Sequence, residues 1–365
     1  MSKVYFTDFR TTEDRSLLDK LEALVKKAGI GTIDFNKKFV AIKIHFGELG
    51  NMAFLRPQWA KRIADIVKAA GGKPFLTDCG TLYVGCRKDA LEHLATAAEN
   101  GFSPLSTGCQ IIIADGLKGT DETVVPTPGM KHIKEAKIGH AIMDADIVIS
   151  LNHFKGHEMA GFGGAIKNLG MGSGSRAGKM AQHTSGKPRV VPDKCKRCRQ
   201  CVKVCANGAI AYDEDGVAHI DQAKCVGCGR CFGWCNFDAI EHGSWDANDM
   251  LNEKMAEYAL AVVKGRPNFH INIINQVSPK CDCYGANDAP IIPDVGMLAS
   301  FDPVALDAAS ADLCNAAPVV KGSCIDGIQD KDHFHACGGG TNWRTQIEHG
   351  EKIGLGESKY ELVKV

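Results

Sequence analysis

The order of apolar and polar positions divides most of the chain into segments with a strand period and segments with a helix period. Short runs rich in β-branched residues are typical of buried strands, and they occupy residues 38–47, 73–80, 109–116, 145–153 and 268–276. Amphipathic patterns with a period of about 3.6 residues predict helices over residues 56–72, 87–101, 252–265 and 302–315. Since strands and helices alternate, the pattern favours an α/β fold with a mostly parallel sheet.

Between residues 187 and 242 this alternation stops. The segment holds eight cysteines, and residues 210–220 predict a β-hairpin with an Asp-Gly turn. The α/β pattern returns after it. We therefore expect one discontinuous α/β core, residues 1–186 and 243–365, with a small α+β module inserted at residues 187–242. Two α/β domains bridged by the module are the alternative that the pattern leaves open.

Composition narrows the setting in which the protein works. Its 365 residues are 44% hydrophobic and 24% charged, as in an ordinary globular protein, and the formal net charge is +0. This balance gives no sign of binding to nucleic acid or to an acidic membrane. The first residues carry no secretory signal and no apolar run reaches transmembrane length, so we expect a cytoplasmic protein. In that reducing compartment, 16 cysteines indicate thiolate–metal chemistry rather than disulfides.

Two cysteine runs inside the inserted segment share one spacing. The motif C-x₂-C-x₂-C-x₃-C is formed first by Cys195, Cys198, Cys201 and Cys205 and then by Cys225, Cys228, Cys231 and Cys235. Three closely spaced thiolates can hold three corners of a [4Fe–4S] cube, and in two-cluster ferredoxins the fourth cysteine of each run binds the other cluster. We therefore expect one cluster on Cys195, Cys198, Cys201 and Cys235, and a second on Cys225, Cys228, Cys231 and Cys205. Zinc sites use more widely separated cysteine pairs, and the compartment argues against disulfides.

Basic residues surround the first cysteine run. They are Lys187, Arg189, Lys194, Lys196, Arg197, Arg199 and Lys203. A basic surface steers an acidic redox partner toward a cluster, so residues 187–203 are the expected face for a redox partner protein. Compensation of the negative charge of a thiolate-ligated cluster is the alternative.

A glycine-rich stretch follows the strand predicted at residues 145–153. It holds His153, Lys155, His157, Lys167, Gly163, Gly164, Gly170 and Gly172. Ligands of α/β sheets gather beyond the carboxyl ends of the strands, so we expect a ligand or substrate site here. His153, Lys155 and His157 are the candidate catalytic residues, whether the chain around them is helical or extended. Lys167 and the four glycines are candidates for binding a cofactor, because backbone N–H groups can cradle an anion. Histidines that only form hydrogen bonds and glycines that only allow close packing are the alternative.

Other predicted strands end where they could join this site. His45 lies at the end of the strand at 38–47 and Asp78 at the end of the strand at 73–80, and we expect both to bind the cofactor. Cys281 and Cys283 follow the strand at 268–276, and their sulfurs are soft-metal ligands, so we expect them to bind a metal. Their spacing argues against an easy disulfide between them. Buried structural thiols are the alternative.

With these motifs together, the chain resembles the uncharacterised family called domain of unknown function three hundred and sixty-two, in its ferredoxin-bearing form. The likeness rests on residues 42–51, 76–85, 111–119, 151–172, 279–283 and 294–312. Residues 187–242 resemble a bacterial-type two-cluster ferredoxin domain. A more distant likeness, of overall kind, is to nickel-pincer lactate racemases, but their His-x₃-Glu-His-x₃-Lys pattern is absent here.

The sequence thus predicts an iron–sulfur protein that carries electrons through two [4Fe–4S] clusters to a ligand or substrate site in the α/β core. An oxidoreductase that acts on an unknown small molecule is the function that we favour. Two alternatives stay open. One is a non-catalytic redox adaptor or electron carrier, and the other is a non-redox enzyme with structural or sensory clusters.

Overall fold

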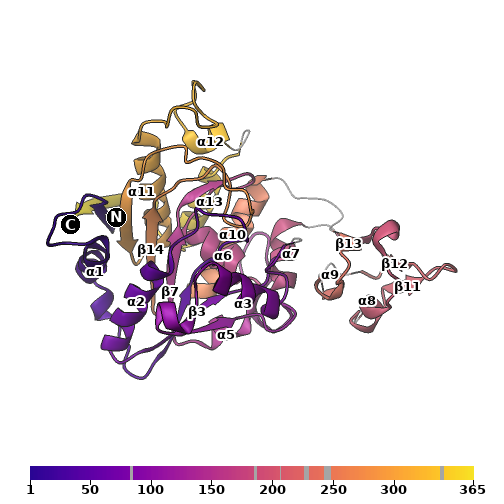
Figure 1. Ribbon diagram of the computed structural model, residues 1–365. Coiled ribbons are helices and arrows are strands. Elements are labelled where there is room, and N and C mark those ends of the chain that lie inside the picture. Colours follow the sequence, from indigo (N-terminus) through magenta and orange to yellow (C-terminus); the bar gives the residue numbers. More distant parts are fainter. Residues whose placement is uncertain (83–84, 185–186, 206, 226–229, 242–247, 338–340) are drawn as a thin grey trace.

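An eight-stranded sheet forms the centre of the molecule (Figure 1). The computed structural model describes residues 1–365 except 83–84, 185–186, 206, 226–229, 242–247 and 338–340. In spatial order the strands are β16 (Tyr360–Lys364), β1 (Ser2–Asp8), β15 (Gly296–Ser300), β14 (Asn268–Ile274), β7 (Ile147–His153), β2 (Phe39–Lys43), β3 (Lys73–Asp78) and β4 (Gln110–Ile113). Neighbouring strands run parallel, except that β15 is antiparallel to both β1 and β14. The predicted α/β fold with a mostly parallel sheet is confirmed.

Helices cover both faces of the sheet, which explains the apolar character of its central strands. Alternate residues of β2 and β7 face opposite layers, with Ala41 and Val148 in one hydrophobic cluster and Ile42 and Ile149 in the other. The first layer contains α6 (Ala165–Ser173), α10 (Asn248–Val263), α11 (Pro303–Ala316) and α13 (Arg344–Lys352). The second layer contains α1 (Leu17–Lys27), α2 (Pro57–Ala69) and part of α3 (Ala90–Glu99).

Strands from both sides of residues 187–242 belong to this one sheet. The predicted helix at 302–315 is α11. Its cap is as expected, because the Asp302 side chain accepts from the amides of Val304 and Ala305 and Pro303 begins the helix. The prediction missed β1, β15 and β16, which form the other side of the sheet. No helix among the described residues is long and apolar enough to span a membrane.

The glycine-rich stretch after β7 is extended before it becomes helical. Strands β8 (Lys155–His157) and β9 (Gly161–Gly163) pair antiparallel, and α6 and α7 (Arg176–His183) follow. The remaining short elements of the core are α4 (Pro104–Thr107), β5 (Glu122–Pro126), β6 (Glu135–Gly139), α5 (His140–Asp144) and α12 (His333–Cys337). The stretch therefore starts as a hairpin at the end of a central strand, and its histidines do not share a helix face.

Residues 189–241 form a separate group of short elements that projects from the core beside α7 (Figure 1). The elements are β10 (Arg189–Val190), α8 (Gln200–Lys203), β11 (Ile210–Tyr212), β12 (Ala218–Ile220), α9 (Arg230–Trp234) and β13 (Ile240–Glu241). The predicted hairpin is β11–β12, and Gly216 in its turn has a φ of 78° that suits glycine. Ile210, Ala218 and Ile240 belong to a small hydrophobic cluster of their own.

Candidate functional site

A cavity opens at the carboxyl ends of four neighbouring parallel strands, β14, β7, β2 and β3. The strands end nearly level, since Lys43 of β2 lies opposite Thr77 of β3 and His153 of β7 lies opposite Ile273 of β14. The empty space amounts to about 860 Å³, including the open mouth. Ligands of open α/β sheets bind at this edge, so the cavity lies where the sequence predicted a site.

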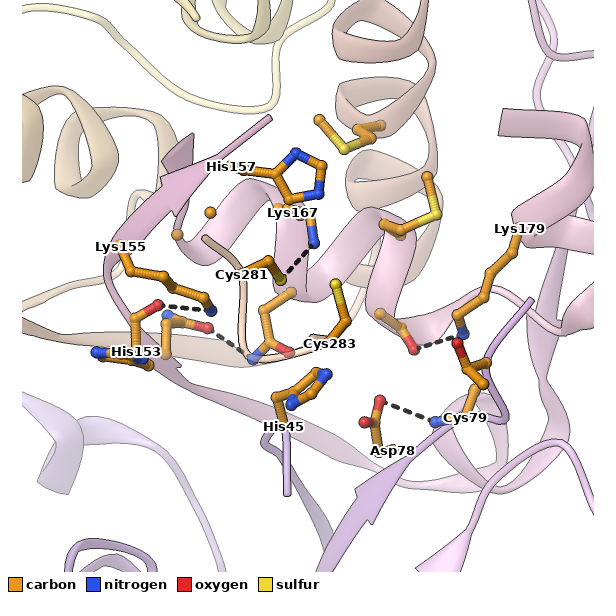
Figure 2. A pocket seen from close by; sticks show the side chains of 18 of the residues that line it. His45, Asp78, Cys79, His153, Lys155, His157, Lys167, Lys179, Cys281 and Cys283 are labelled. Carbon is orange, nitrogen blue, oxygen red and sulfur yellow. Dashed lines mark hydrogen bonds between the residues drawn. The ribbon is translucent and has the colours of Figure 1, made fainter. Parts of the chain in front are cut away.

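Most of the predicted site residues line this cavity, and Figure 2 labels those among them that are not glycines. They are His45, Asp78, His153, Lys155, His157, Gly163, Gly164, Lys167, Gly172, Cys281 and Cys283. Cys79, Lys179 and His183 also line it. The sequence marks Lys179 only as a charge that could assist anion binding by the glycine-rich stretch, and it does not select Cys79 or His183. Lys179 and His183 lie one turn apart on α7.

Gly170 does not belong to the cavity wall, unlike its neighbours in the prediction. A Cβ on Gly170 would lie 2.1 Å from the carbonyl oxygen of Met255, so this glycine lets α6 approach α10. A Cβ on Gly164 would lie 2.3 Å from Oδ1 of Asp307, whose carboxylate accepts from the amide of Ala165 at 2.7 Å. Close packing of α6 therefore accounts for these two glycines.

A buried ion pair lies at the floor of the cavity. Lys43 Nζ is 2.8 Å from Asp78 Oδ1, with both side chains almost fully buried, and it also donates to Oδ1 of Asn168 at 2.7 Å. Burial alone would raise the pKa of Asp78, but the charge of Lys43, together with those of His45, His93 and Lys179, outweighs burial and holds that pKa well below its usual range. Asp78 is thus a fixed anion whose main partner is a lysine of the neighbouring strand.

His153 uses both ring nitrogens within the protein. Its Nδ1 is 2.8 Å from Oδ1 of Asp282, and its Nε2 is 2.8 Å from the carbonyl oxygen of Asn275. Both partners are acceptors, so both nitrogens donate and the ring is a cation. Burial would raise the pKa of Asp282, but His153 and then Lys155 lower it well below its usual range. With no ring nitrogen left over, His153 positions Asp282 and is poorly suited to pass protons to a ligand.

His157 lies with the two cysteines of the loop after β14. One ligand atom each of His157, Cys281 and Cys283 lies within 4.8 Å of the others, and all three residues line the cavity. Lys167 Nζ donates to Sγ of Cys281 at 3.4 Å, a contact drawn in Figure 2. The structure therefore joins the predicted histidine, lysine and cysteines in one group.

Charges in this group differ between the two thiols. A hydrogen bond from the Cys283 thiol lowers the pKa of Cys281 well below its usual value, and the same bond raises the pKa of Cys283. Burial would lower the pKa of Lys167, but the thiolate of Cys281 raises it. Burial, with Lys167 next in weight, lowers the pKa of His157, so this ring is neutral. The arrangement is a thiolate held by an ammonium group and a second thiol.

Four cysteines of residues 189–241 line one hollow. They are Cys195, Cys198, Cys201 and Cys235. The first three belong to the first cysteine run and the fourth ends the second run, so residues from both runs meet here. Their mutual proximity also appears in the pKa of Cys201, which burial raises and the charges of Cys235, Cys198 and Cys195 raise further.

Of the other four cysteines, Cys228 lies outside the described residues. Cys225 and Cys231 are buried and Cys205 is partly buried. The two runs have matching surroundings, because Cys205 accepts from the amide of Ala209 and Cys235 accepts from the amide of Ala239, both at 3.3 Å. Each fourth cysteine is therefore held by the amide four residues further on, so the sequence repeat is also a structural one.

The cysteine-rich segment touches the core beside the cavity. Lys88 Nζ donates to the carbonyl oxygen of Cys235 at 3.0 Å and also pairs with Asp238. The ammonium of Lys118 lies 3.8 Å from the centre of the Trp234 ring, and the guanidinium of Arg176 lies 5.5 Å from that of Phe232. No local sequence signal marks these contacts, because they join segments far apart in the chain.

The basic flank of the first run is mostly exposed. Lys194, Lys196, Arg197 and Arg199 are exposed, as is Cys198 between them. Lys194 and Arg189 both pair with Glu241, at 2.9 and 3.6 Å. The charge near Cys198 is therefore at the surface, next to the hollow that Lys196, Arg197 and Arg199 also line.

Comparisons with known proteins give a family and several partial relatives. A sequence model of the family described as "Domain of unknown function (DUF362)" matches residues 40–312. The thiosulfate reductase electron transfer subunit PhsB of Salmonella typhi is 34% identical over 64 residues, 17% of this chain and 33% of that protein. The electron transport protein HydN of Escherichia coli strain K12 is 41% identical over 49 residues, 13% of this chain and 27% of that protein.

These matches are local. A selenate reductase subunit of Mesobacillus selenatarsenatis is 40% identical over 86 residues, 21% of this chain and 30% of that protein. The chain thus spans about a third or less of these three curated relatives. Among solved structures, the lactate racemase apoprotein from Thermoanaerobacterium thermosaccharolyticum gives a TM-score of 0.37 at 13% identity, covering 70% of this chain and 48% of that one. That likeness is too weak to bear on the fold or the function.

Proposed function

Because this chain belongs to the DUF362 family, whose description assigns no activity, we propose a function from its own residues. The protein is an iron–sulfur electron-transfer protein that holds two [4Fe–4S] clusters and delivers electrons to the cavity at the edge of its α/β sheet. Residues 187–242 are the ferredoxin-like module, and the core cavity binds the small molecule that is reduced or oxidised.

The observation that carries this proposal is the hollow lined by Cys195, Cys198, Cys201 and Cys235. This set is the one that the ferredoxin pattern assigns to a single cluster, with the fourth ligand from the other run. A zinc site would instead combine C-x₂-C pairs that a longer stretch of sequence separates. The amide of Ala239 donates to Cys235 Sγ at 3.3 Å. Hydrogen bonds of this kind help to set the reduction potential of a cluster. The donor set therefore fits a [4Fe–4S] group.

The matching amide contact at Cys205 extends the argument to the second cluster. Cys205, Cys225, Cys231 and Cys228 would hold it. When bound, the clusters supply one-electron chemistry, and the thiolates of the chain hold them in place. The local likeness to the thiosulfate reductase electron transfer subunit and to the electron transport protein HydN supports the iron–sulfur role.

The chain's own residues define the two ends of the electron path. On the outside, Lys196, Arg197 and Arg199 beside the exposed Cys198 form the face for an acidic redox partner. On the inside, Lys88, Lys118 and Arg176 hold α9 against the core, and α7 continues from Arg176 to Lys179 and His183 in the cavity wall. The second cysteine run thus lies against the wall of the site.

The cavity itself favours an anionic ligand. Lys179 Nζ donates to the carbonyl oxygens of Gly172 and Gly174 and forms no ion pair with a carboxylate among the described residues. Two further ammonium groups lie in the same wall, that of Lys155, which pairs with Asp282 at 3.1 Å, and that of Lys167, which donates to Cys281 at 3.4 Å. Ammonium groups in a poorly hydrated cavity bind an anion strongly. We therefore propose a small anionic substrate.

Metal analysis of protein purified without oxygen tests the proposal. We expect about eight iron atoms and about eight acid-labile sulfides per chain. Cys198→Ser should remove roughly half of both, because it breaks one cluster and leaves the other. Cys314→Ser, which changes a buried cysteine of α11, should remove neither.

A wild-type protein that contains stoichiometric zinc and no labile sulfide would contradict the proposal. Equal loss of iron in Cys198→Ser and Cys314→Ser would also contradict it, because iron would then depend on folding and not on that thiol. Reduced iron content in both variants together with a loss of secondary structure identifies such a folding effect.

A further inference from the structure

We propose that Cys281 and Cys283 form a redox-active dithiol, which is oxidised reversibly to a Cys281–Cys283 disulfide inside the core cavity. The inference rests on core side chains alone. It goes beyond electron transfer by the module, since it gives the core a two-electron centre of its own.

The loop after β14 brings the two thiols together. The amide of Tyr284 donates to the carbonyl oxygen of Cys281 at 3.0 Å, which closes a turn over residues 281–284. Both Sγ atoms line the same cavity, and they lie within 4.8 Å of each other. From sequence alone, we expect the two cysteines to be too close along the chain for an easy disulfide. In a turn, the backbone folds back and the two sulfurs need only a small shift to meet.

Neighbouring side chains prepare Cys281 for thiol chemistry. Lys167 Nζ donates to its sulfur at 3.4 Å, and the sulfur of Cys283 lies within 4.8 Å of it. A thiolate is the nucleophile in thiol–disulfide exchange, and nearby cations favour it. Cys281 is therefore the attacking sulfur, and Cys283 is the sulfur that completes the disulfide.

The hydrogen bonding of His157 favours this role over a metal site. Its Nδ1 accepts from the amides of Met159 and Ala160, both at 3.1 Å. The neutral ring therefore carries its proton on Nε2, where a metal would have to bind. Histidine ligands usually donate from the other nitrogen to an acceptor, which is the reverse of what is found here. The ammonium of Lys167 next to Cys281 also opposes a second cation.

The reaction balances with a small disulfide as the oxidant. The Cys281 thiolate attacks one sulfur of the bound disulfide, that S–S bond breaks, and a mixed disulfide forms with release of one thiolate. The Cys283 sulfur then attacks Cys281 Sγ, its proton passes to a released thiolate, and the second product leaves. One S–S bond is broken and one is formed, and two electrons pass from the protein to the disulfide. Two electrons per chain, the number that two one-electron clusters would hold, together with one proton from solvent, restore the Cys281 thiolate and the Cys283 thiol.

Thiol counting tests this proposal in the full-length protein. Native protein is equilibrated without oxygen at a series of ratios of reduced to oxidised glutathione, then denatured and alkylated at once. Trypsin releases residues 281–321 as one peptide, which contains Cys281, Cys283 and Cys314. We expect three alkyl groups on it under reducing conditions and one under oxidising conditions. The remaining group should be on Cys314, which serves as an internal control.

Variants separate the pair from other cysteines. In Cys283→Ser, oxidising conditions should no longer remove two alkyl groups from the peptide. Cys109→Ser, at a buried position in the other layer of the core, should leave the titration unchanged. Three alkyl groups at every ratio, or a stable glutathione adduct on one cysteine without the internal disulfide, would overturn the proposal.

A metal at the same residues would overturn it too. X-ray absorption at the zinc edge would then report two sulfur ligands and one nitrogen ligand, lost in Cys281→Ser. The thiol count does not depend on iron, and the iron and sulfide content does not depend on Cys281 or Cys283. Failure of this inference is therefore distinguishable from failure of the proposed electron transfer.

Discussion

Charged side chains in the core are compensated by specific buried partners. Lys43 has no exposed side-chain surface, and Asp78 compensates its charge at 2.8 Å. Removing one partner of a buried pair leaves an uncompensated charge, which costs far more than loss of a surface pair. The strand sequence offered a clue, because Lys43 interrupts an otherwise apolar strand. Its partner could not be read from the sequence, since β3 had to be placed next to β2 first.

Replacing Asp78 by asparagine should therefore lower the free energy of unfolding by about 3–5 kcal/mol. Asp65→Asn is the matched control, because Asp65 pairs with Lys61 on an exposed helix face and the change should cost less than about 1 kcal/mol. Urea unfolding followed by circular dichroism under anaerobic conditions measures both variants. Equal effects of the two substitutions would show that the Lys43–Asp78 pair is not the source of this stability.

Helix α6 joins the site to the rest of the core. It carries Lys167 and Asn168 into the cavity wall on one side and packs against α10 on the other. Gly170 allows the close approach, since a Cβ there would meet the Met255 carbonyl oxygen at 2.1 Å. The glycines of this stretch had two interpretations in the sequence, anion binding and close packing, and only the tertiary neighbours separate them.

Gly170→Ala should push the two helices apart and destabilise the protein by about 1–3 kcal/mol, as overpacking of a dense core does. Gly31→Ala is the control, because nothing lies within 4 Å of a Cβ there and no unusual φ is required. Thermal unfolding of the two variants gives the comparison. A Gly170→Ala protein as stable as Gly31→Ala would contradict the packing role.

Sequence patterns predicted individual strands and helices better than they predicted which of them lie side by side in the fold. The apolar runs of β2, β3, β7 and β14 and the cap of α11 at Asp302 follow from local rules, and the structure has them. β1, β15 and β16 were missed. β1 and β16 lie toward the edge of the sheet, and their alternating patterns are short and partly exposed. β15 is antiparallel to both of its neighbours, which the alternation of strands and helices could not predict.

At the scale of the molecule, the site gathers residues from distant parts of the chain. His45, His157 and Cys281 come from segments separated by more than a hundred residues, yet they meet because parallel strands end at one edge. That rule predicted the location. The turn at Cys281 and the hydrogen bonds of His153 and His157 depend on tertiary contacts, so the roles of these residues could not be predicted from the sequence.

The module and the core together should behave as one redox unit. Contacts of Lys88, Lys118 and Arg176 hold α9 against the core, next to the helix that contributes Lys179 to the cavity. If the clusters are bound and the dithiol starts as a disulfide, the chain has a defined capacity for electrons. The clusters take about one electron each and the disulfide takes about two.

Reductive titration of anaerobically purified, fully oxidised protein, with absorbance followed in the visible range, tests the central claim most directly. The account predicts that about four electrons enter per chain. About two should bleach the visible absorbance of the clusters, and about two should enter without bleaching. Uptake of about two electrons, all with bleaching, would retain the iron–sulfur function and reject the dithiol. A protein that takes up no electrons and has no visible absorbance to bleach would contradict the account of this chain as an iron–sulfur electron-transfer protein.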